Sequence, residues 1–267
     1  MTKRIDFLPL YAVLFLIFLY GPVLLLPLFS FNDATYAVFP LKGFTFKAYQ
    51  QMAQDPSLLN SLKNSLMVAT GVALVSTTFG LLAAMGVTRY KMPGRGPVMG
   101  GIMLPLVVPS IILSVALLVI VRQVFDIPLT LWTVGAGHVL LCVPFSMMVL
   151  MARLEGFDKS LEEASGDLGE NGWMTFWRVT FPLALPGVVS SLLMSFTISL
   201  DEYVMAFFLS GLDQTLPIFL YSQLRFPQRL PMTLALGSTI LVVSTIIVIF
   251  SEILRRRGVQ TTKPSGL

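Results

Sequence analysis

The stretch EEASGDLGENGWMTFWRVTFPLALPG, from Glu162 to Gly187, interrupts a chain that is otherwise strongly apolar. Of the 267 residues, 55% are hydrophobic and only 12% are charged, whereas soluble domains have about 25% charged residues. The mean hydropathy is +0.80. These values indicate an integral membrane protein, so an acidic stretch with several glycines requires an explanation of its own.

Long apolar runs lie on both sides of this stretch. Each is close to the roughly 20 residues with which a helix crosses a bilayer, and none alternates like the strands of a membrane barrel. The first run is too long for the apolar part of a signal peptide and lacks a small-residue cleavage site, so we expect it to be retained. The sequence therefore predicts an all-α membrane protein with six transmembrane helices, at 7–30, 64–87, 97–121, 129–151, 184–209 and 232–254.

The Lys and Arg residues predict the orientation of these helices, because cytoplasmic loops are enriched in them. Twelve of the 18 basic residues fall on one side, namely Lys3, Arg4, Arg89, Lys91, Arg95, Arg153, Lys159, Arg178, Arg255, Arg256, Arg257 and Lys263. The other side holds Lys42, Lys47, Lys63, Arg122, Arg225 and Arg229. Both termini and the stretch 158–182 are therefore expected in the cytoplasm.

The interrupting stretch predicts a short helix, a turn and a second helix. Ser160 followed by Glu163 matches a capping box at a helix start, and Gly169 can close that helix in a left-handed conformation. The turn GENG, 169–172, then reverses the chain. Pro182 and Pro186 are expected to break the second helix, which begins near residue 173, before the fifth span. Local features alone would also fit a simple interfacial helix.

The spacing within the stretch resembles the EAA motif of ABC-importer permeases. That motif begins with Glu, Ala and a small residue, followed by three variable positions and a Gly. Nine further variable positions then lead to an aliphatic residue, one more position, an apolar residue and Pro. The matching residues are Glu163, Ala164, Ser165, Gly169, Val179, Phe181 and Pro182. Ser165, Val179 and Phe181 depart mildly from the usual Ala, Ile and Leu. The resemblance implies a type I importer permease (MetI-like) fold, with spans 2 to 6 as its core.

What the resemblance further implies is a coupling helix that seats in a groove of a cytoplasmic ATPase. The residues assigned to this contact are Glu162, Glu163, Ala164, Ser165, Gly169 and Pro182. Small side chains would permit close approach, and the carboxylates would meet basic groups of the partner. The implied assembly has a second permease in a heterodimer, two ATPase subunits and a periplasmic binding protein, in the inner membrane of a bacterium.

In that frame the chain has an N-terminal helix at 1–31, a periplasmic loop at 32–63, a permease core at 64–254 with the coupling segment 158–182, and a cytoplasmic tail at 255–267. The chain lacks the phosphate-binding loop of ATPases, and no metal or catalytic set forms around its single histidine, His138, or its single cysteine, Cys142. We therefore expect no enzyme activity, no nucleic-acid binding and no cofactor in this chain, with ATP and Mg²⁺ bound by the ATPase subunits.

A second unusual stretch, SFTISLDEYVMAFFLSG from Ser195 to Gly211, places two carboxylates in an apolar run. A charge at the centre of a membrane helix costs about 2.5 to 3.5 kcal/mol. On an unbroken helix Asp201 would share a face with Thr197 and Phe208, and Glu202 with Ser195 and Ser199. The pair either is structural, bonded to groups such as Arg225 or Arg229, or lines a path for a cation. The candidate pathway residues are Asp201, Glu202, Thr197, Ser199, Tyr203 and Phe208.

The cargo expectation rests on a second resemblance. SLDEYVMAFFLSG followed by TLPIFLYSQL is similar to the polyamine (spermidine/putrescine) branch of these permeases, whose fifth span carries a similar acidic pair. Ser110, after LPLVVP, stands where several members have an acid. A permease for another small solute, an ion-coupled carrier that uses Asp201 or Glu202, and a membrane scaffold are the alternatives.

Overall fold

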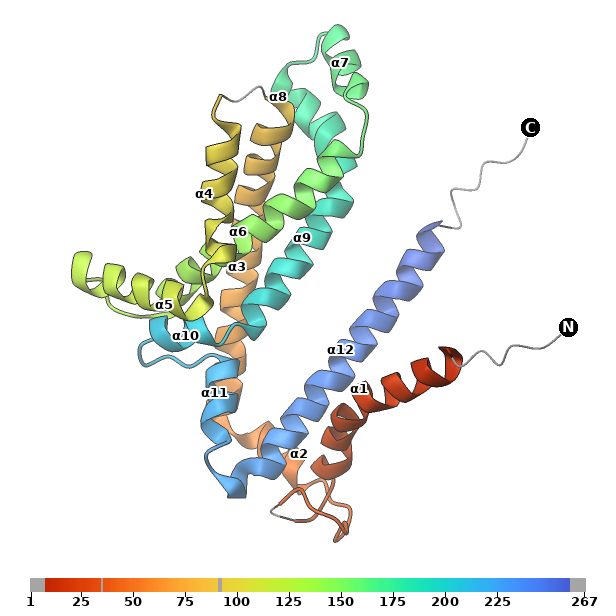
Figure 1. The fold of residues 1–267 in the computed structure, drawn as a ribbon, viewed down its shortest axis with the longest axis vertical. Coiled ribbons are helices and arrows are strands. Elements are labelled where there is room, and N and C mark those ends of the chain that lie inside the picture. The colour runs from red at the N-terminus through yellow and green to blue at the C-terminus, as the bar shows by residue number, and fades with distance from the viewer. Residues whose placement is uncertain (1–7, 35, 91–92, 260–267) are drawn as a thin grey trace, which may run out of the picture. The chain divides into compact units, whose positions relative to one another are not determined.

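The computed structural model describes residues 8–34, 36–90 and 93–259, which divide into two units. The first unit contains residues up to Pro56 and from Leu220 onward, and the second runs from Ser57 to Phe219. Every regular element in the described ranges is a helix, with one isolated β-bridge between Asn32 and Phe44. The predicted all-α class is therefore confirmed (Figure 1).

Some residues used for the orientation prediction lie outside the described part of the chain. They are Lys3, Arg4, Lys91 and Lys263, together with the side chains of Arg255, Arg256 and Arg257. Most of the predicted tail, 255–267, lies outside it as well. The orientation of the termini therefore stays a prediction.

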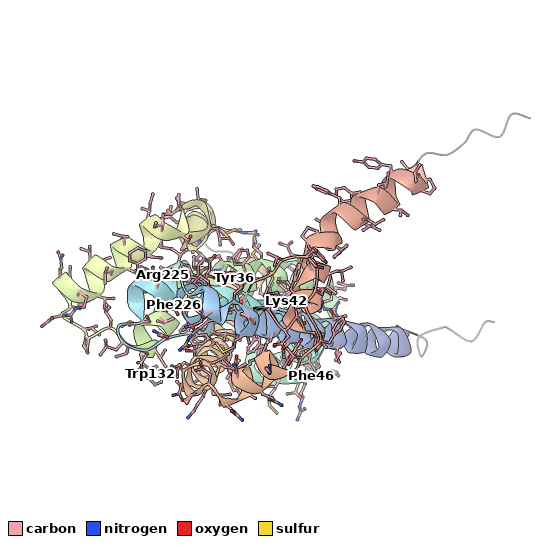
Figure 2. The ribbon with its side chains drawn as sticks, turned by 90° about the horizontal axis from the view of Figure 1, so that it is seen from below. Tyr36, Lys42, Phe46, Trp132, Arg225 and Phe226 are labelled. Atoms are coloured by element: carbon pink, nitrogen blue, oxygen red, sulfur yellow. The ribbon has the colours of Figure 1, made fainter. Side chains whose placement is uncertain are left out.

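The first unit is built on three helices, α1 (Leu8–Ser30), α2 (Lys47–Gln54) and α12 (Leu230–Val259). Helix α12 packs against both of the others. The hydroxyl of Tyr49 on α2 links them, since it lies 2.7 Å from Ser30 Oγ and 3.3 Å from Ser238 Oγ. The connection between α1 and α2 carries exposed aromatic side chains, including Tyr36 and Phe46 (Figure 2).

The second unit contains the helices from α3 to α10 and the start of α11 (Leu216–Gln223). The end of α11 and the short η3 (Pro227–Arg229) belong to the first unit and lead along the chain into α12. The elements of the second unit before α11 are, in chain order, α3 (Pro56–Arg89), α4 (Arg95–Val107), α5 (Ser110–Val119), η1 (Ile120–Val124), α6 (Leu131–Glu155), α7 (Ser160–Asp167), α8 (Gly172–Thr175), η2 (Phe176–Thr180), α9 (Phe181–Asp201) and α10 (Val204–Leu209). In Figure 1, α3, α4, α6 and α9 run alongside one another, with α7 and α8 at one end and α5 and α10 towards the other.

Close helix packing in this unit depends on small residues, as is usual in membranes. A Cβ on Gly80 of α3 would lie 2.5 Å from the Cβ of Ser146, and one on Gly187 of α9 would lie 2.9 Å from the Cβ of Arg153. Both partners are on α6. Two hydroxyl pairs add to this packing: Ser146 of α6 lies 2.8 Å from Ser195 of α9, and Thr77 of α3 lies 3.0 Å from Ser191 of α9. Helices α3, α6 and α9 are thus each packed closely against the other two.

Most of the six predicted spans have a counterpart among the helices, but several differ in their bounds or shape. Among the described residues, four helices are long and apolar enough to cross a membrane, or five when the α4 and α5 pair counts as one span. The sixth predicted span falls within α12, whose side chains from residue 247 onward are not described. Helix α3 begins at Pro56 rather than at 64, so the predicted loop 32–63 contains α2 and the first turns of α3.

The third predicted span, 97–121, is wrong as a single helix. The chain bends by 102° between α4 and the α5–η1 segment. Pro109 has no N–H to continue the helix, and its ring disfavours a helical conformation at Val108, whose ψ is 130°. Pro109 therefore produces a broken helix here.

The fifth predicted span, 184–209, has different bounds. One continuous helical segment runs from Gly172 to Asp201, and Pro182 and Pro186 lie within it. The turn just before Pro182, η2, is a π-helix in which the N–H of Phe181 donates to the carbonyl of Phe176. This wider turn gives room for the proline ring near the preceding carbonyls, which an α-turn would not. The expected break is therefore absent, and the helix ends instead at Asp201.

Candidate functional site

The polar segment 158–182, which we call the knob, starts with a cap that differs from the predicted one. The Oδ1 of Asp158 accepts a hydrogen bond of 3.0 Å from the Ser160 amide, whereas no side-chain cap bond joins Ser160 and Glu163. The expected capping box is therefore wrong, because Asp158 reaches the free amide first. The backbone and side-chain hydrogen bonds from Ser160 lower the pKa of Asp158. The carboxylate therefore keeps its charge to a lower pH than an aspartate without these hydrogen bonds.

The end of α7 is a tight left-handed turn, as predicted. Gly169 has a φ of +91°, its N–H donates to the carbonyl of Gly166 at 2.9 Å, and the N–H of Glu170 donates to Ser165 at 3.2 Å. This pair of bonds is a Schellman motif. Asn171 then caps α8 through a 2.9 Å bond from Met174 N–H to its Oδ1. Both ends of the turn are therefore fixed by hydrogen bonds.

Ser165 faces the interior of the knob. Its side chain is buried, and its Oγ lies 3.1 Å from Oγ1 of Thr175 on α8. We expected this small residue to let a partner approach, but it instead lets α8 approach α7. Ala164 and Glu163, beside it in the motif, are exposed.

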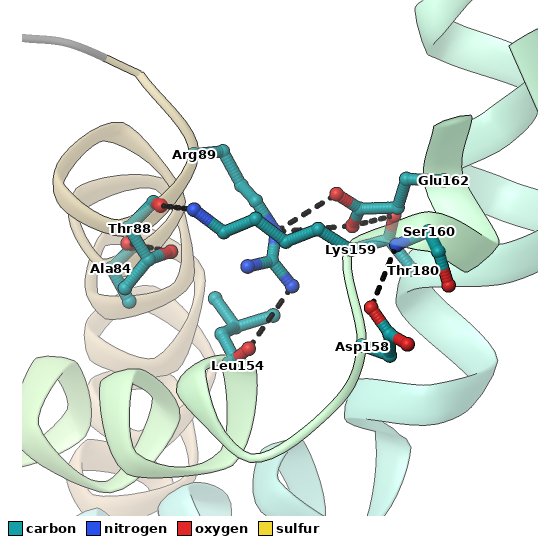
Figure 3. A network of polar contacts seen from close by, with 9 residues as sticks. All are labelled: Ala84, Thr88, Arg89, Leu154, Asp158, Lys159, Ser160, Glu162 and Thr180. Atoms are coloured by element: carbon teal, nitrogen blue, oxygen red, sulfur yellow. Dashed lines mark hydrogen bonds and ion pairs between the residues drawn. The ribbon is translucent and has the colours of Figure 1, made fainter.

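Glu162 also points inward, into the network in Figure 3. Its carboxylate lies 2.9 Å from Nε of Arg89, the last residue of α3, and accepts a 2.7 Å bond from Thr180 Oγ1. The Arg89 guanidinium also donates to the carbonyl of Leu154 at 3.0 Å and stacks over the ring of Phe157. Glu162 therefore ties the knob to the ends of three long helices, and the expectation that it meets a partner's basic group is corrected.

The outer face of the knob combines exposed motif residues with exposed apolar side chains. Of the six predicted contact residues, Glu163, Ala164, Gly169 and Pro182 are exposed. The large apolar side chains on this segment that are exposed are Leu161, Leu168, Trp173 and Trp177. Leu168, in the turn that follows α7, is the most exposed of these four, at 86%. The apolar contribution was missed because the motif contains none of these positions.

The Glu162 network predicts a large effect of Arg89→Gln. Because Arg89 is 8% exposed, its loss leaves a partly buried carboxylate without its charge partner, and such losses cost about 3 kcal/mol or more. We expect a lower thermal midpoint of the purified protein. The matched control is Arg95→Gln, whose pair with Glu155 spans 3.8 Å between half-exposed side chains and should contribute at most about 1 kcal/mol. The double variant Arg89→Gln Glu162→Gln should lose less free energy of unfolding than the two single variants lose together. A loss equal to or larger than that sum would show that the network assignment is wrong.

The acidic pair lies at a helix break and not inside a helix. Asp201 is the last residue of α9, and Glu202 follows it in extended conformation. The Oε1 of Glu202 accepts a 3.1 Å bond from the amide of Met205, which caps α10. The expected alignment of Asp201 with Phe208 on one helical face is therefore wrong, because the helix does not continue between them.

Arg225 and Arg229 belong to the first unit and the two acids to the second, so pairing between them stays a prediction. Among the described residues of the second unit, neither Asp201 nor Glu202 is in an ion pair, and within the first unit Arg229 pairs with Asp55 at 3.4 Å. The other candidate pathway residues divide into two kinds. Thr197 bonds the carbonyl of Leu193 on its own helix, and Ser199 bonds His138 on α6. The rings of Tyr203 and Phe208 both contact the ring of Phe207.

Glu202 lines a cavity of about 450 Å³ at the α4–α5 break. The lining residues are Pro105, Leu106, Val107, Val108, Pro109, Ser110, Leu141, Phe145, Ile198 and Glu202. Two helix breaks therefore meet at one cavity whose walls are mainly apolar and whose one ionisable side chain is a carboxylate. The hydropathy pattern did not indicate it, since it depends on where α4 and α9 end.

Comparisons with known proteins agree with these features. Residues 76–259 match the family described as binding-protein-dependent transport system inner membrane component. The chain is 33% identical over 242 residues to the spermidine/putrescine transport system permease protein PotC of Haemophilus influenzae, covering 90% of this chain and 93% of that one. It is 32% identical over 218 residues to the putrescine transport system permease protein PotI of Escherichia coli, covering 78% and 76%.

A solved structure shares the fold at low sequence identity. The crystal structure of a bacterial ABC transporter involved in the import of the acidic polysaccharide alginate matches with a TM-score of 0.72 and 18% identity. The match covers 94% of this chain and 98% of that one. The arrangement of helices is therefore that of an importer permease.

Proposed function

The chain belongs to the family of binding-protein-dependent transport system inner membrane components, and from that premise we propose that it is the permease subunit of an ATP-driven importer for polyamines. Its fold is the type I (MetI-like) permease fold. The relatives that it resembles over most of its length carry spermidine and putrescine in their names. The proposed cargo is therefore spermidine, putrescine or a related amine.

The observation that carries the transport role is the knob. It is a short helix–turn–helix whose two ends are fixed by hydrogen bonds, and Glu162 joins it to the ends of α3, α6 and the segment leading into α9. A force applied to its exposed face would thus reach three long helices. We propose that an ATPase subunit docks on this face, and that closure of an ATPase pair moves these helices. ATP and Mg²⁺ would be bound by the ATPase subunits.

The cargo assignment is supported by the cavity beside Glu202. A polyamine consists of ammonium groups separated by methylene chains, so it needs carboxylates for its ends and apolar walls for its middle. Glu202 supplies a carboxylate, and Val107, Leu141 and Ile198 are among the apolar residues that line the same cavity. Helix breaks of this kind build binding sites near the middle of many transporters.

The proposed assembly contains a second permease subunit in a heterodimer, two ATPase subunits and a periplasmic binding protein. We place it in the inner membrane of a bacterium with both termini and the knob in the cytoplasm, on the basis of the basic residues. Helix α9, with 21 residues, is about 30 Å long, so the acidic pair would lie far from the knob and towards the outer side.

Reconstitution into vesicles tests this function. With a partner permease, ATPase subunits and binding protein present, we expect uptake of radiolabelled spermidine or putrescine that requires ATP hydrolysis and resists a proton ionophore. Vesicles loaded with a non-hydrolysable ATP analogue are the control. Uptake by this chain alone that collapses with the ionophore would identify an ion-coupled carrier instead. ATP-dependent uptake of a different solute only would refute the polyamine assignment.

A further inference from the structure

His138 is a buried polar side chain that the proposed mechanism leaves without a role. It lies on α6, is 1% exposed, and its Nδ1 is 2.8 Å from the Oγ of Ser199. Ser199 is in the last turn of α9, two residues before Asp201 and three before Glu202. This hydrogen bond therefore holds α9 at the turn that leads into the acidic pair.

The same part of α6 also holds the other side of the break. The Oγ1 of Thr133 donates to the carbonyl of Leu209, the last residue of α10, at 2.7 Å. Gly137 lies so close to α10 that a Cβ on it would be 2.5 Å from the sulfur of Met205. The end of α9 and the whole of α10 are thus fixed to one short segment of α6, and Glu202 lies between the two attachments.

Packing alone does not explain a histidine here. Within the described part of the chain the Nε2 of His138 is buried and has no hydrogen-bond partner, and an unsatisfied buried polar group destabilises a fold. An apolar side chain of similar size would avoid that cost. What the imidazole provides in exchange is the bond from Nδ1 to Ser199.

We propose that His138 is a positioning residue for cargo recognition: through Ser199 it sets the height and rotation of the last turn of α9, and so the place of the Glu202 carboxylate at its cavity. This inference rests on the proposed function, in which that carboxylate meets an ammonium group of the cargo. His138 itself does not contact the cargo in this scheme. It acts only through Ser199.

The test uses the reconstituted transporter and the variants His138→Leu, His138→Asn and Ser199→Ala. Loss of the bond should raise the KM for polyamine uptake about tenfold in His138→Leu and Ser199→Ala, with ATPase co-purification unchanged. His138→Asn carries a polar atom near the position of Nδ1, so its KM should stay within about twofold. In a Glu202→Gln background, His138→Leu should add no further loss, because both changes act on the same carboxylate.

Cys142, one turn further along α6, reports whether the variants remain packed. Its thiol is buried against the carbonyl of Ser195 on α9, so a membrane-permeant maleimide should not label it in any variant. Rapid labelling in His138→Leu would overturn the inference, since the defect would then be loss of packing. The inference would also be overturned if the KM is unchanged in His138→Leu but raised in Glu202→Gln. That result would leave the proposed function intact. An unchanged KM in Glu202→Gln would refute the cargo site itself.

Discussion

Replacement of Gly169 by leucine should abolish ATP-driven uptake and co-purification of the ATPase subunits, while the protein still inserts into the membrane. Gly169 closes α7 with a φ of +91° on the exposed side of the knob. A side chain in this conformation costs about 1 to 2 kcal/mol. Bulk in the centre of a docked surface should add about 2 kcal/mol or more of lost binding energy. Pull-down of the tagged ATPase and uptake in vesicles measure the two effects.

The structure separates backbone strain from obstruction of a partner. Apart from its chain neighbours, no described residue has an atom within 4 Å of a Cβ built on Gly169, so a side chain there points into open space where a partner can dock. Gly94 provides the matched control, since it has a φ of +79° and equally open surroundings. Gly94→Leu should therefore show similar strain and keep the ATPase. Asparagine tolerates left-handed backbone, so Gly169→Asn should isolate the effect of bulk. Normal ATPase association in Gly169→Leu would refute the docking face.

The knob illustrates what local sequence can and cannot predict. The turn at Gly169 and the start of α8 near Trp173 follow from glycine and asparagine chemistry over a few residues, and the structure has both. Glu162 is different, because its partner Arg89 is 73 residues away in the chain. A carboxylate on a polar stretch gives no signal of whether it faces solvent or a distant arginine. The inward orientation of Glu162 and Ser165 could therefore not be predicted.

The helix breaks show a similar limit. Hydropathy detects apolar runs whatever their shape, so it located the third and fifth runs but not the bend at Pro109 or the end of α9 at Asp201. A proline can break a helix, as Pro109 does, or be accommodated by a π-turn, as at Pro182. The residues beside each proline do not by themselves distinguish these two outcomes. The cavity at Glu202 arises where two such breaks meet, which makes it a tertiary feature.

Neutralisation of the acidic pair is the second change from which we expect a large effect. Glu202→Gln keeps an oxygen that can still accept the Met205 amide bond and cap α10, so it removes the charge with little change in shape. Loss of a charge-assisted bond to an ammonium group corresponds to about 1.5 to 3 kcal/mol, which is roughly a ten- to hundredfold rise in KM. Asp201→Asn should also reduce uptake, and the double variant should lose nearly all of it.

The control for this experiment is an acid in the same unit that is outside the cavity. Asp213, in the exposed connection after α10, fits that description, and Asp213→Asn should transport normally. All variants should co-purify with the ATPase subunits, because the knob lies at the other end of α9. Normal polyamine uptake by Asp201→Asn Glu202→Gln would contradict a cargo role and leave Glu202 as the cap of α10. A lower thermal midpoint in Glu202→Gln would favour that structural role as well, because it would show that the charge of the carboxylate stabilises the start of α10.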